Sequence, residues 1–220
     1  MYIAEACSQI EYDIALTDSI GYALNKMNDL HSSQLVVLHQ EAFLGVVTEE
    51  QLLNAEDEEQ KLDQLQAQFK FLYLYADQHV YDALQYMTAH QLSLLPIMDK
   101  DNKYLGAATA NDLMPLLNTV LGNEEPGAII VLELGKLDIS FTHIAHLVES
   151  ENMRIRSTAI REIPNSTKVE MTLRLDKQNI ANLVATLWRY DYTVKATFND
   201  GSPDSDIKER YDILMNYLNL

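Results

Sequence analysis

The stretch GAATANDLM, residues 106–114, joins a short apolar run to a pattern of helical spacing. Gly106 interrupts the run, Thr109 follows two alanines, and Asp112 comes three residues after the threonine. A threonine at the N-cap and an aspartate at the third helical position form a capping box, in which each side chain accepts a hydrogen bond from the other residue's backbone N–H. The stretch therefore predicts a strand that runs directly into a capped helix.

A similar stretch, FLGVVTEEQLL at residues 43–53, belongs to an earlier copy of a longer repeat. In each copy a segment of helical spacing precedes two short runs rich in branched residues. Thr17 and Asp77 are the predicted N-caps of the helical segments. Each copy therefore predicts the order helix, strand, strand, helix. The aligned positions are Ala23 and Leu24 with Ala83 and Leu84, Met27 with Met87, Gly45 with Gly106, and Thr48 with Thr109.

One copy alone has too little apolar surface to form a stable core. The two copies, at about residues 1–60 and 61–121, are therefore expected to pack their sheets together into one domain, residues 1–121. The acidic segment between them is predicted to be a surface connector. The segment LGNEEPG, at residues 121–127, is rich in glycine and proline and predicts the end of this domain.

The duplicated unit resembles paired cystathionine-β-synthase-type (CBS) domains, a tandem regulatory module. The family signature is a glycine, two apolar residues, Thr or Ser, two variable residues and Asp. Gly106, Thr109 and Asp112 fit this signature completely. The resemblance implies that an adenine nucleotide or adenosyl ligand (AMP, ADP, ATP or S-adenosylmethionine) binds between the repeats. It also implies that Asp112 accepts hydrogen bonds from both ribose hydroxyls, and that Thr109 and the helix N-terminus face phosphate. Gly106 would let the backbone approach the ligand.

The first copy departs from this signature and is interpreted as the weaker site. Gly45 and Thr48 are in place, but Gln51 replaces the aspartate and offers one acceptor oxygen without charge. Pro96 matches a family position in the strand after the first helix of the second copy, and Val36 replaces it in the first. A strand proline removes a ladder donor and is expected at an edge or rim. The alternative for both motifs is a capping box and nothing more.

The second half of the chain changes its pattern. Its predicted elements follow the order βαββαβ over residues 128–200, with KVEMTLRLD alternating between apolar and polar residues. This order predicts a ferredoxin-like domain of four antiparallel strands and two helices. After a CBS pair it resembles the ACT domain of acetoin-utilisation-type CBS proteins. The turn LGKLDISF keeps Gly135 and Asp138, a predicted N-cap, but lacks the Pro-Gly pair of amino-acid-binding ACT domains, so a dimerising or transmitting domain without its own ligand is expected.

The C-terminal segment, residues 201–220, is predicted to form a docking or dimerisation helix, because a helix of this length with one apolar stripe is not stable alone in water. Both resembled families commonly dimerise, so a homodimer is expected. The residues of the stripe are Ile207, Tyr211, Leu214 and Leu218.

Composition excludes several classes of partner. The net charge is −17, from 16 Lys+Arg against 33 Asp+Glu, and it disfavours binding to nucleic acid and anionic membranes. Cys7 is the only cysteine, and the chain has no apolar run of membrane-spanning length, so a soluble protein of the reducing cytoplasm is expected. His143 and His146 lie three residues apart without further ligands, so no metal site is predicted.

These observations predict a mixed α/β (α+β) fold: a CBS-domain pair, an ACT-type domain and a C-terminal helix. The predicted function is that of a regulatory sensor for an adenosyl ligand. No nucleophile or acid–base group is evident, so the chain is not expected to be an enzyme and needs no cofactor for catalysis. The alternative is a structural or interaction protein that has kept the fold and lost its ligands.

Overall fold

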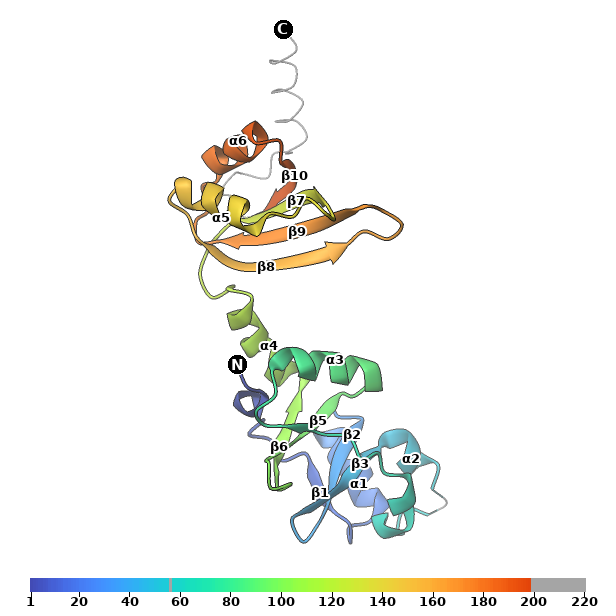
Figure 1. The fold of residues 1–220 in the computed structure, drawn as a ribbon. Helices are drawn as coiled ribbons and strands as arrows, with labels where there is room; N and C mark the ends of the chain where they lie inside the picture. Colours follow the sequence, from blue (N-terminus) through green and yellow to red (C-terminus); the bar gives the residue numbers. More distant parts are fainter. Residues whose placement is uncertain (56, 199–220) are drawn as a thin grey trace. The chain divides into compact units, whose positions relative to one another are not determined.

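The computed structural model describes residues 1–55 and 57–198 and divides into two compact units, Met1–Leu117 and Asn118–Leu220 (Figure 1). Both units contain helices and sheets, so the predicted mixed α+β fold is confirmed. The division falls inside helix α4, Ala110–Val120. The predicted C-terminal helix at residues 201–220 lies outside the described residues.

The first unit contains the two predicted repeats, and each repeat forms its own three-stranded sheet. In each sheet the first strand is parallel to the middle strand and the third is antiparallel to it. The sequence analysis missed the short first strands, β1 and β4. The first repeat consists of η1 (Ile3–Ala6), β1 (Asp13–Ala15), α1 (Ile20–Asp29), β2 (Gln34–His39), β3 (Ala42–Thr48) and α2 (Glu49–Leu53). The second repeat follows with η2 (Leu62–Gln68), β4 (Leu74–Tyr75), α3 (Val80–His90), β5 (Leu94–Met98), β6 (Tyr104–Thr109) and α4.

The two repeats share a core, as the sequence predicted. Val36 and Phe43 of the first sheet are buried in one cluster with Leu94 and Ala107 of the second. Gln34, a buried polar residue, fixes the register between the repeats, because its Oε1 accepts from the backbone N–H of Leu94 at 3.3 Å. A buried amide needs hydrogen-bond partners, so this bond favours one register between the two repeats over others.

Three local predictions for this unit were wrong. The N-caps of α1 and α3 are Ser19 and His79, two residues after Thr17 and Asp77. Asp77 instead pairs with Lys100, with 2.8 Å between its Oδ2 and the lysine Nζ. The acidic connector is also not purely a surface segment, because η2 buries two leucines in the core of the first repeat. They are Leu62 and Leu65.

The second unit has the predicted βαββαβ order and a single antiparallel sheet with strand order β10-β7-β9-β8. Both helices cover the same face of this sheet (Figure 1). Ser140, not Asp138, is the N-cap of α5, because its Oγ accepts from the N–H of His143 at 3.3 Å. The elements are β7 (Ile129–Gly135), α5 (Phe141–Ser150), β8 (Ile155–Glu162), β9 (Lys168–Leu175), α6 (Ala181–Arg189) and β10 (Thr193–Phe198).

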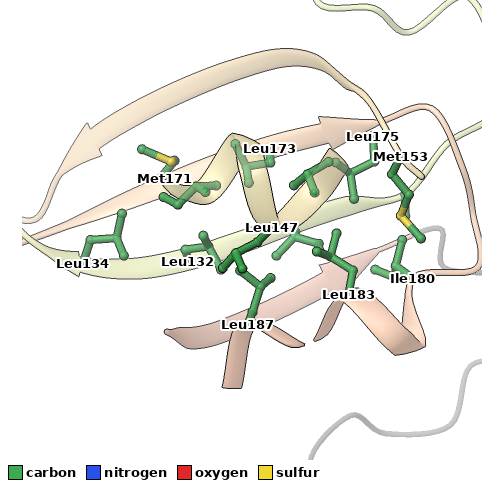
Figure 2. Packing of buried hydrophobic residues seen from close by; sticks show 14 of the residues in the cluster. Leu132, Leu134, Leu147, Met153, Met171, Leu173, Leu175, Ile180, Leu183 and Leu187 are labelled. Atoms are coloured by element: carbon green, nitrogen blue, oxygen red, sulfur yellow. The ribbon is translucent and has the colours of Figure 1, made fainter. Parts of the chain in front are cut away.

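Alternation along the strands builds the core of this unit. Leu132 and Leu134 of β7 and Met171 and Leu173 of β9 point toward the helices, where Leu147 and other helix residues meet them (Figure 2). Side chains of the intervening positions lie on the other face of the sheet, because successive residues of a strand point to opposite sides. The sequence pattern of period two therefore predicted the buried face correctly.

The face without helices carries a buried carboxylate. Glu170 of β9 is 7% exposed and accepts hydrogen bonds from Lys195 of β10 and Arg161 of β8. These bonds, with that from Lys195 the larger cause, lower the pKa of Glu170 below its ordinary value. One carboxylate thus links three of the strands of the sheet through charge-assisted hydrogen bonds.

Candidate ligand site at the motif of the second repeat

The motif of the second repeat is held by the passage from β6 into α4. Gly106 and Thr109 lie on β6, and Asp112 lies in the first turn of α4. The Asp112 carboxylate accepts from the Thr109 N–H at 2.8 Å and from the Thr109 hydroxyl at 2.6 Å. Both bonds fall on Oδ2, so the second carboxylate oxygen lies outside the capping box. The predicted capping role of Asp112 is therefore confirmed, and it uses one of the two oxygens.

The segment before β1 covers this motif from the other repeat. The backbone N–H of Ser8 donates to the carbonyl of Ala107 at 2.9 Å, next to the motif glycine. Gly106 has φ of +149°, a conformation that side chains rarely adopt, and a Cβ placed there would lie 3.6 Å from Sγ of Cys7. That distance is an ordinary van der Waals contact. Cys7 therefore lies over Gly106 without pressing on it.

The pKa values of Cys7, Tyr12 and Tyr104 are all raised, and the charge of Asp112 contributes for Cys7 and Tyr12. Burial raises the pKa of the Cys7 thiol, and the charge of Asp112 raises it further. The same two causes, in the same order, raise the pKa of Tyr12. Burial, followed by the charges of Asp13 and Cys7, raises the pKa of Tyr104. The Cys7 thiol and the Tyr12 hydroxyl, whose pKa values are raised, therefore stay protonated near pH 7.

Pro96 lies on β5, opposite Ala107 of β6, and is buried. β5 is the middle strand of its sheet, so Pro96 is not on an edge strand, but it lies beyond the end of β4. The sheet tolerates this proline because β4 pairs only with Ile97 and Met98, so the opposite side of β5 is outside the ladder at Pro96. Its place beside Ala107 puts it one residue from the motif glycine along the neighbouring strand.

The first motif has the same backbone geometry and a different surrounding. Thr48 and Gln51 form the predicted capping box, with the Thr48 N–H donating to Gln51 Oε1 at 2.8 Å. The other end of the Gln51 amide, Nε2, donates to the carbonyl of Gln68 at 2.6 Å. A Cβ placed on Gly45, whose φ is +147°, would lie 2.9 Å from Cβ of Phe69. Both ends of the Gln51 amide are thus engaged in hydrogen bonds, and the motif glycine is tightly covered.

The sequence analysis missed the covering residues Cys7 and Phe69. They do not belong to the motifs, and each reaches its glycine from the other repeat. In the structure, Lys70 pairs with Val46, and Ser8 bonds to Ala107, at equivalent positions after the two motif glycines. Extending the alignment upstream at the spacing of Ala23 and Ala83 places Gln9, not Cys7, opposite Phe69, so the alignment alone does not identify Cys7.

Other predicted features were located as well. His143 lies half-buried on α5, where its Nδ1 is 2.8 Å from the Tyr192 hydroxyl, and His146 is exposed on the same helix. Within residues 1–55 and 57–198, no group of three or more His, Cys, Asp or Glu side chains is arranged to hold a metal ion. In the same ranges, no helix has the length and apolar character needed to cross a membrane.

Residues 68–118 match the family model of the CBS domain. The chain contains a CBS domain. The match confirms the resemblance of the second repeat to a CBS domain, and its range includes the four residues predicted to bind a ligand there. These residues are Pro96, Gly106, Thr109 and Asp112.

Comparison with solved structures finds proteins that contain CBS domains. One is a CBS domain pair/ACT domain protein from Thermotoga maritima, with 20% identity, a TM-score of 0.48, and coverage of 53% of this chain and 96% of that chain. Another contains the CBS domains of a transcriptional regulator from Streptococcus pneumoniae, with 21% identity, a TM-score of 0.46, and coverage of 52% and 98%. A third is the cytosolic domain of the Mg²⁺ channel MgtE in complex with ATP, with 15% identity, a TM-score of 0.40, and coverage of 47% and 44%. A comparison with curated proteins finds no match.

Proposed function

We propose that this protein is a regulatory sensor that binds an adenine nucleotide or a related adenosyl ligand at the motif of the second repeat. AMP, ADP, ATP and S-adenosylmethionine are the candidate ligands. The ribose hydroxyls donate to Asp112, and the phosphate of a nucleotide lies against Thr109 and the N-terminal end of α4. Backbone N–H groups at a helix start attract phosphate, and a carboxylate accepts two hydroxyl donors at once.

The observation that carries this proposal is the different use of the two capping side chains. Gln51 uses both ends of its amide, on Thr48 and Gln68. Asp112 makes the same cap with Oδ2 alone, and its Oδ1 lies outside the cap. A carboxylate with one oxygen outside the cap can hold a sugar hydroxyl without disturbing the helix start, so capping and binding are compatible at Asp112.

The remaining parts of the proposal concern transmission. The second unit acts as an ACT-like domain that carries the liganded state to the contacts of a homodimer, and its βαββαβ order supports this role. In this proposal the protein is not an enzyme, needs no catalytic cofactor and works in the cytoplasm. Its net charge of −17 disfavours nucleic acid and anionic membrane surfaces as partners.

The second candidate function is a structural or interaction protein without ligands. The closed first motif favours it, because Gly45 lies tightly under Phe69 and Gln51 has become a purely structural cap. If the second motif, like the first, binds no ligand, Asp112 is also only a cap. The two candidate functions differ in one property, the binding of an adenosyl ligand to the folded chain.

A thermal-shift and calorimetry series with the four candidate ligands distinguishes the two functions. A ligand that binds only the folded state at a hundred times its Kd raises the free energy of unfolding by about 2.7 kcal/mol. We expect at least one ligand to do so, and we expect 2′-deoxy-AMP to bind more weakly than AMP because it lacks one ribose hydroxyl. If none of the four ligands binds at millimolar concentration, the sensor proposal is wrong and the interaction protein remains.

A further inference from the structure

The first unit, which carries both motifs, is strongly acidic. Residues 1–117 contain five lysines, no arginine and 18 Asp+Glu, which gives a formal net charge of −13. Every arginine of the chain comes after residue 117. A field of this sign lowers the local concentration of anions and raises that of cations. The charge of a ligand therefore affects its binding at any site in this unit.

Two of the five lysines lie at the wrong end of the motif strand to meet a phosphate. β5 and β6 are antiparallel, with Met98 opposite Tyr104 and Leu94 opposite Thr109. Lys100 and Lys103 belong to the turn between these strands, so they lie at the Tyr104 end of β6. Thr109 and the start of α4 lie at the other end, about 17 Å further on at about 3.3 Å per residue of strand.

The other three lysines have their contacts in the first repeat. Lys61 is the N-cap of η2, which packs against the core of that repeat. Lys70 exchanges backbone hydrogen bonds with Val46, beside the first motif. Lys26 lies on α1, and its Nζ donates to the backbone carbonyl of Asp13 at 2.5 Å.

The charges that act around the second motif are negative. Burial, followed by the charge of Asp112, raises the pKa values of Cys7 and Tyr12. Burial, followed by the charge of Asp13, raises the pKa of Tyr104. Two carboxylates therefore influence the residues around this motif.

The N-terminal end of α4 does not offset this charge. A helix N-terminus carries about half a positive charge, whereas Asp112 places one full negative charge in the first turn. The two residues before it, Ala110 and Asn111, are neutral. A phosphate monoester carries about 1.5 to 2 negative charges at pH 7. The first motif is less suitable still, because Glu49 and Glu50 occupy the first turn of α2.

We propose that the second motif takes an adenosyl ligand without net negative charge and discriminates against nucleotides. The inference rests on the proposed function and deepens it, since it selects S-adenosylmethionine, a sulfonium cation, from the four candidate ligands. In S-adenosylmethionine the sulfonium is attached to C5′ of the ribose, where a nucleotide carries its phosphate. A ribose held by Asp112 thus brings either a positive or a negative group close to the same carboxylate.

The test compares ligands that differ in charge, by isothermal titration calorimetry on the full chain at about 0.01 M salt, where screening is weak. One unit of ligand charge at roughly 8 Å from a carboxylate changes affinity about twofold in water. S-adenosylmethionine and AMP differ by about three units, so S-adenosylmethionine should bind about tenfold more tightly. S-adenosylhomocysteine, which lacks the sulfonium charge, should bind about twofold more weakly than S-adenosylmethionine. Adenosine should bind at least as tightly as AMP, and the preferences should shrink at about 0.5 M NaCl.

A charge variant tests the position of the effect. Ala110→Lys adds a cation at an exposed position in the first turn of α4, so it should strengthen AMP binding severalfold, weaken S-adenosylmethionine binding and leave adenosine unchanged. Asn54→Lys is the matched control, because it adds the same charge at the exposed C-cap of α2 in the first repeat. This variant should keep the wild-type order of ligands. Misfolding cannot strengthen AMP binding, so the result of Ala110→Lys is informative.

The outcomes separate this inference from the sensor function. Tighter binding of AMP, or of ATP without Mg²⁺, than of S-adenosylmethionine would overturn the inference and leave the sensor function standing. Equal gains of AMP affinity in Ala110→Lys and Asn54→Lys would also overturn it, because the charge at the motif would then have no special effect. A chain that binds none of these compounds would overturn the sensor function, and the inference with it.

Discussion

Replacement of Asp112 separates its two roles, because capping and ligand binding depend on different atoms. The Asp112 side chain contributes two hydrogen bonds to the cap, both from Thr109 to Oδ2, of 2.8 and 2.6 Å. Asp112→Ala removes both, and loss of such a cap costs about 1 kcal/mol of folding free energy. For a unit of this size that corresponds to a fall of about 4 °C in Tm.

The loss of ligand affinity should be larger than the loss of stability. Hydrogen bonds to a charged group contribute about 1.5–3 kcal/mol, so Asp112→Ala should weaken nucleotide binding by about ten- to hundredfold. Asp112→Asn is the sharper variant. Its amide oxygen can replace Oδ2 in the cap, while its NH₂ group replaces the other oxygen and cannot accept from a hydroxyl. We therefore expect Asp112→Asn to keep most of the stability and to lose most of the affinity.

Calorimetry of ligand binding and thermal unfolding of the same preparations provide the assay. Gln51→Ala is the matched control in the first motif: it removes the bonds to Thr48 and Gln68, so it should lower Tm and leave affinity at the second motif unchanged. If Asp112→Ala and wild type bind the nucleotide equally well, the ribose-binding role of Asp112 is refuted. A loss of affinity in Gln51→Ala that matches that of Asp112→Ala would refute the inequality of the two motifs.

Three further outcomes are expected. Alanine at Gly45 or Gly106 forces a side chain into the positive-φ region. In urea unfolding, Gly45→Ala should be more destabilising than Gly106→Ala, because the new Cβ at residue 45 also meets an atom at 2.9 Å. The reverse order would contradict the contacts described. The lowered pKa of Glu170 stabilises the second unit above the ordinary pKa of a glutamate, and this stabilisation disappears as the pH falls through the lowered value, so Glu170→Gln should flatten the acid side of the stability profile. Cys7, with its raised pKa, should react with iodoacetamide at pH 8 more slowly in the folded than in the urea-unfolded chain, and Asp112→Asn should speed the reaction; mass spectrometry that finds equal rates would exclude the charge effect.

The repeat was predictable from sequence because it is expressed in local patterns. Branched runs of five or six residues predicted β2 and β5, and the spacing between Thr109 and Asp112 predicted the start of α4. The strands β1 and β4 have only three and two residues, so no periodicity develops in them, and they form because a parallel partner lies beside them. Strand pairing between distant segments leaves no pattern in a short stretch of sequence.

The starts of the helices and the residues that cover the motif were also not predictable from local sequence. Thr17 and Asp77 are good caps by residue type, but the helices begin later, where Ser19 and His79 accept the first free N–H groups. At the site, the sequence identified the residues on β6 and α4 that share one local motif. It could not identify Cys7, since a residue that reaches the motif across the domain has no spacing relation to it.

The exchange of covering segments between the repeats imposes an order on the assembly of the two motifs during synthesis. The first motif has all its parts once Phe69 and Lys70 have left the ribosome, because Gly45, Thr48 and Gln51 precede them. The second motif needs Cys7, which is made near the start, and Asp112, which is made last. An emerging chain therefore completes the first motif early and acquires the second one only when the second repeat has folded back onto the first. Under the proposed function, a ligand can then bind at the second motif only after both repeats have been made.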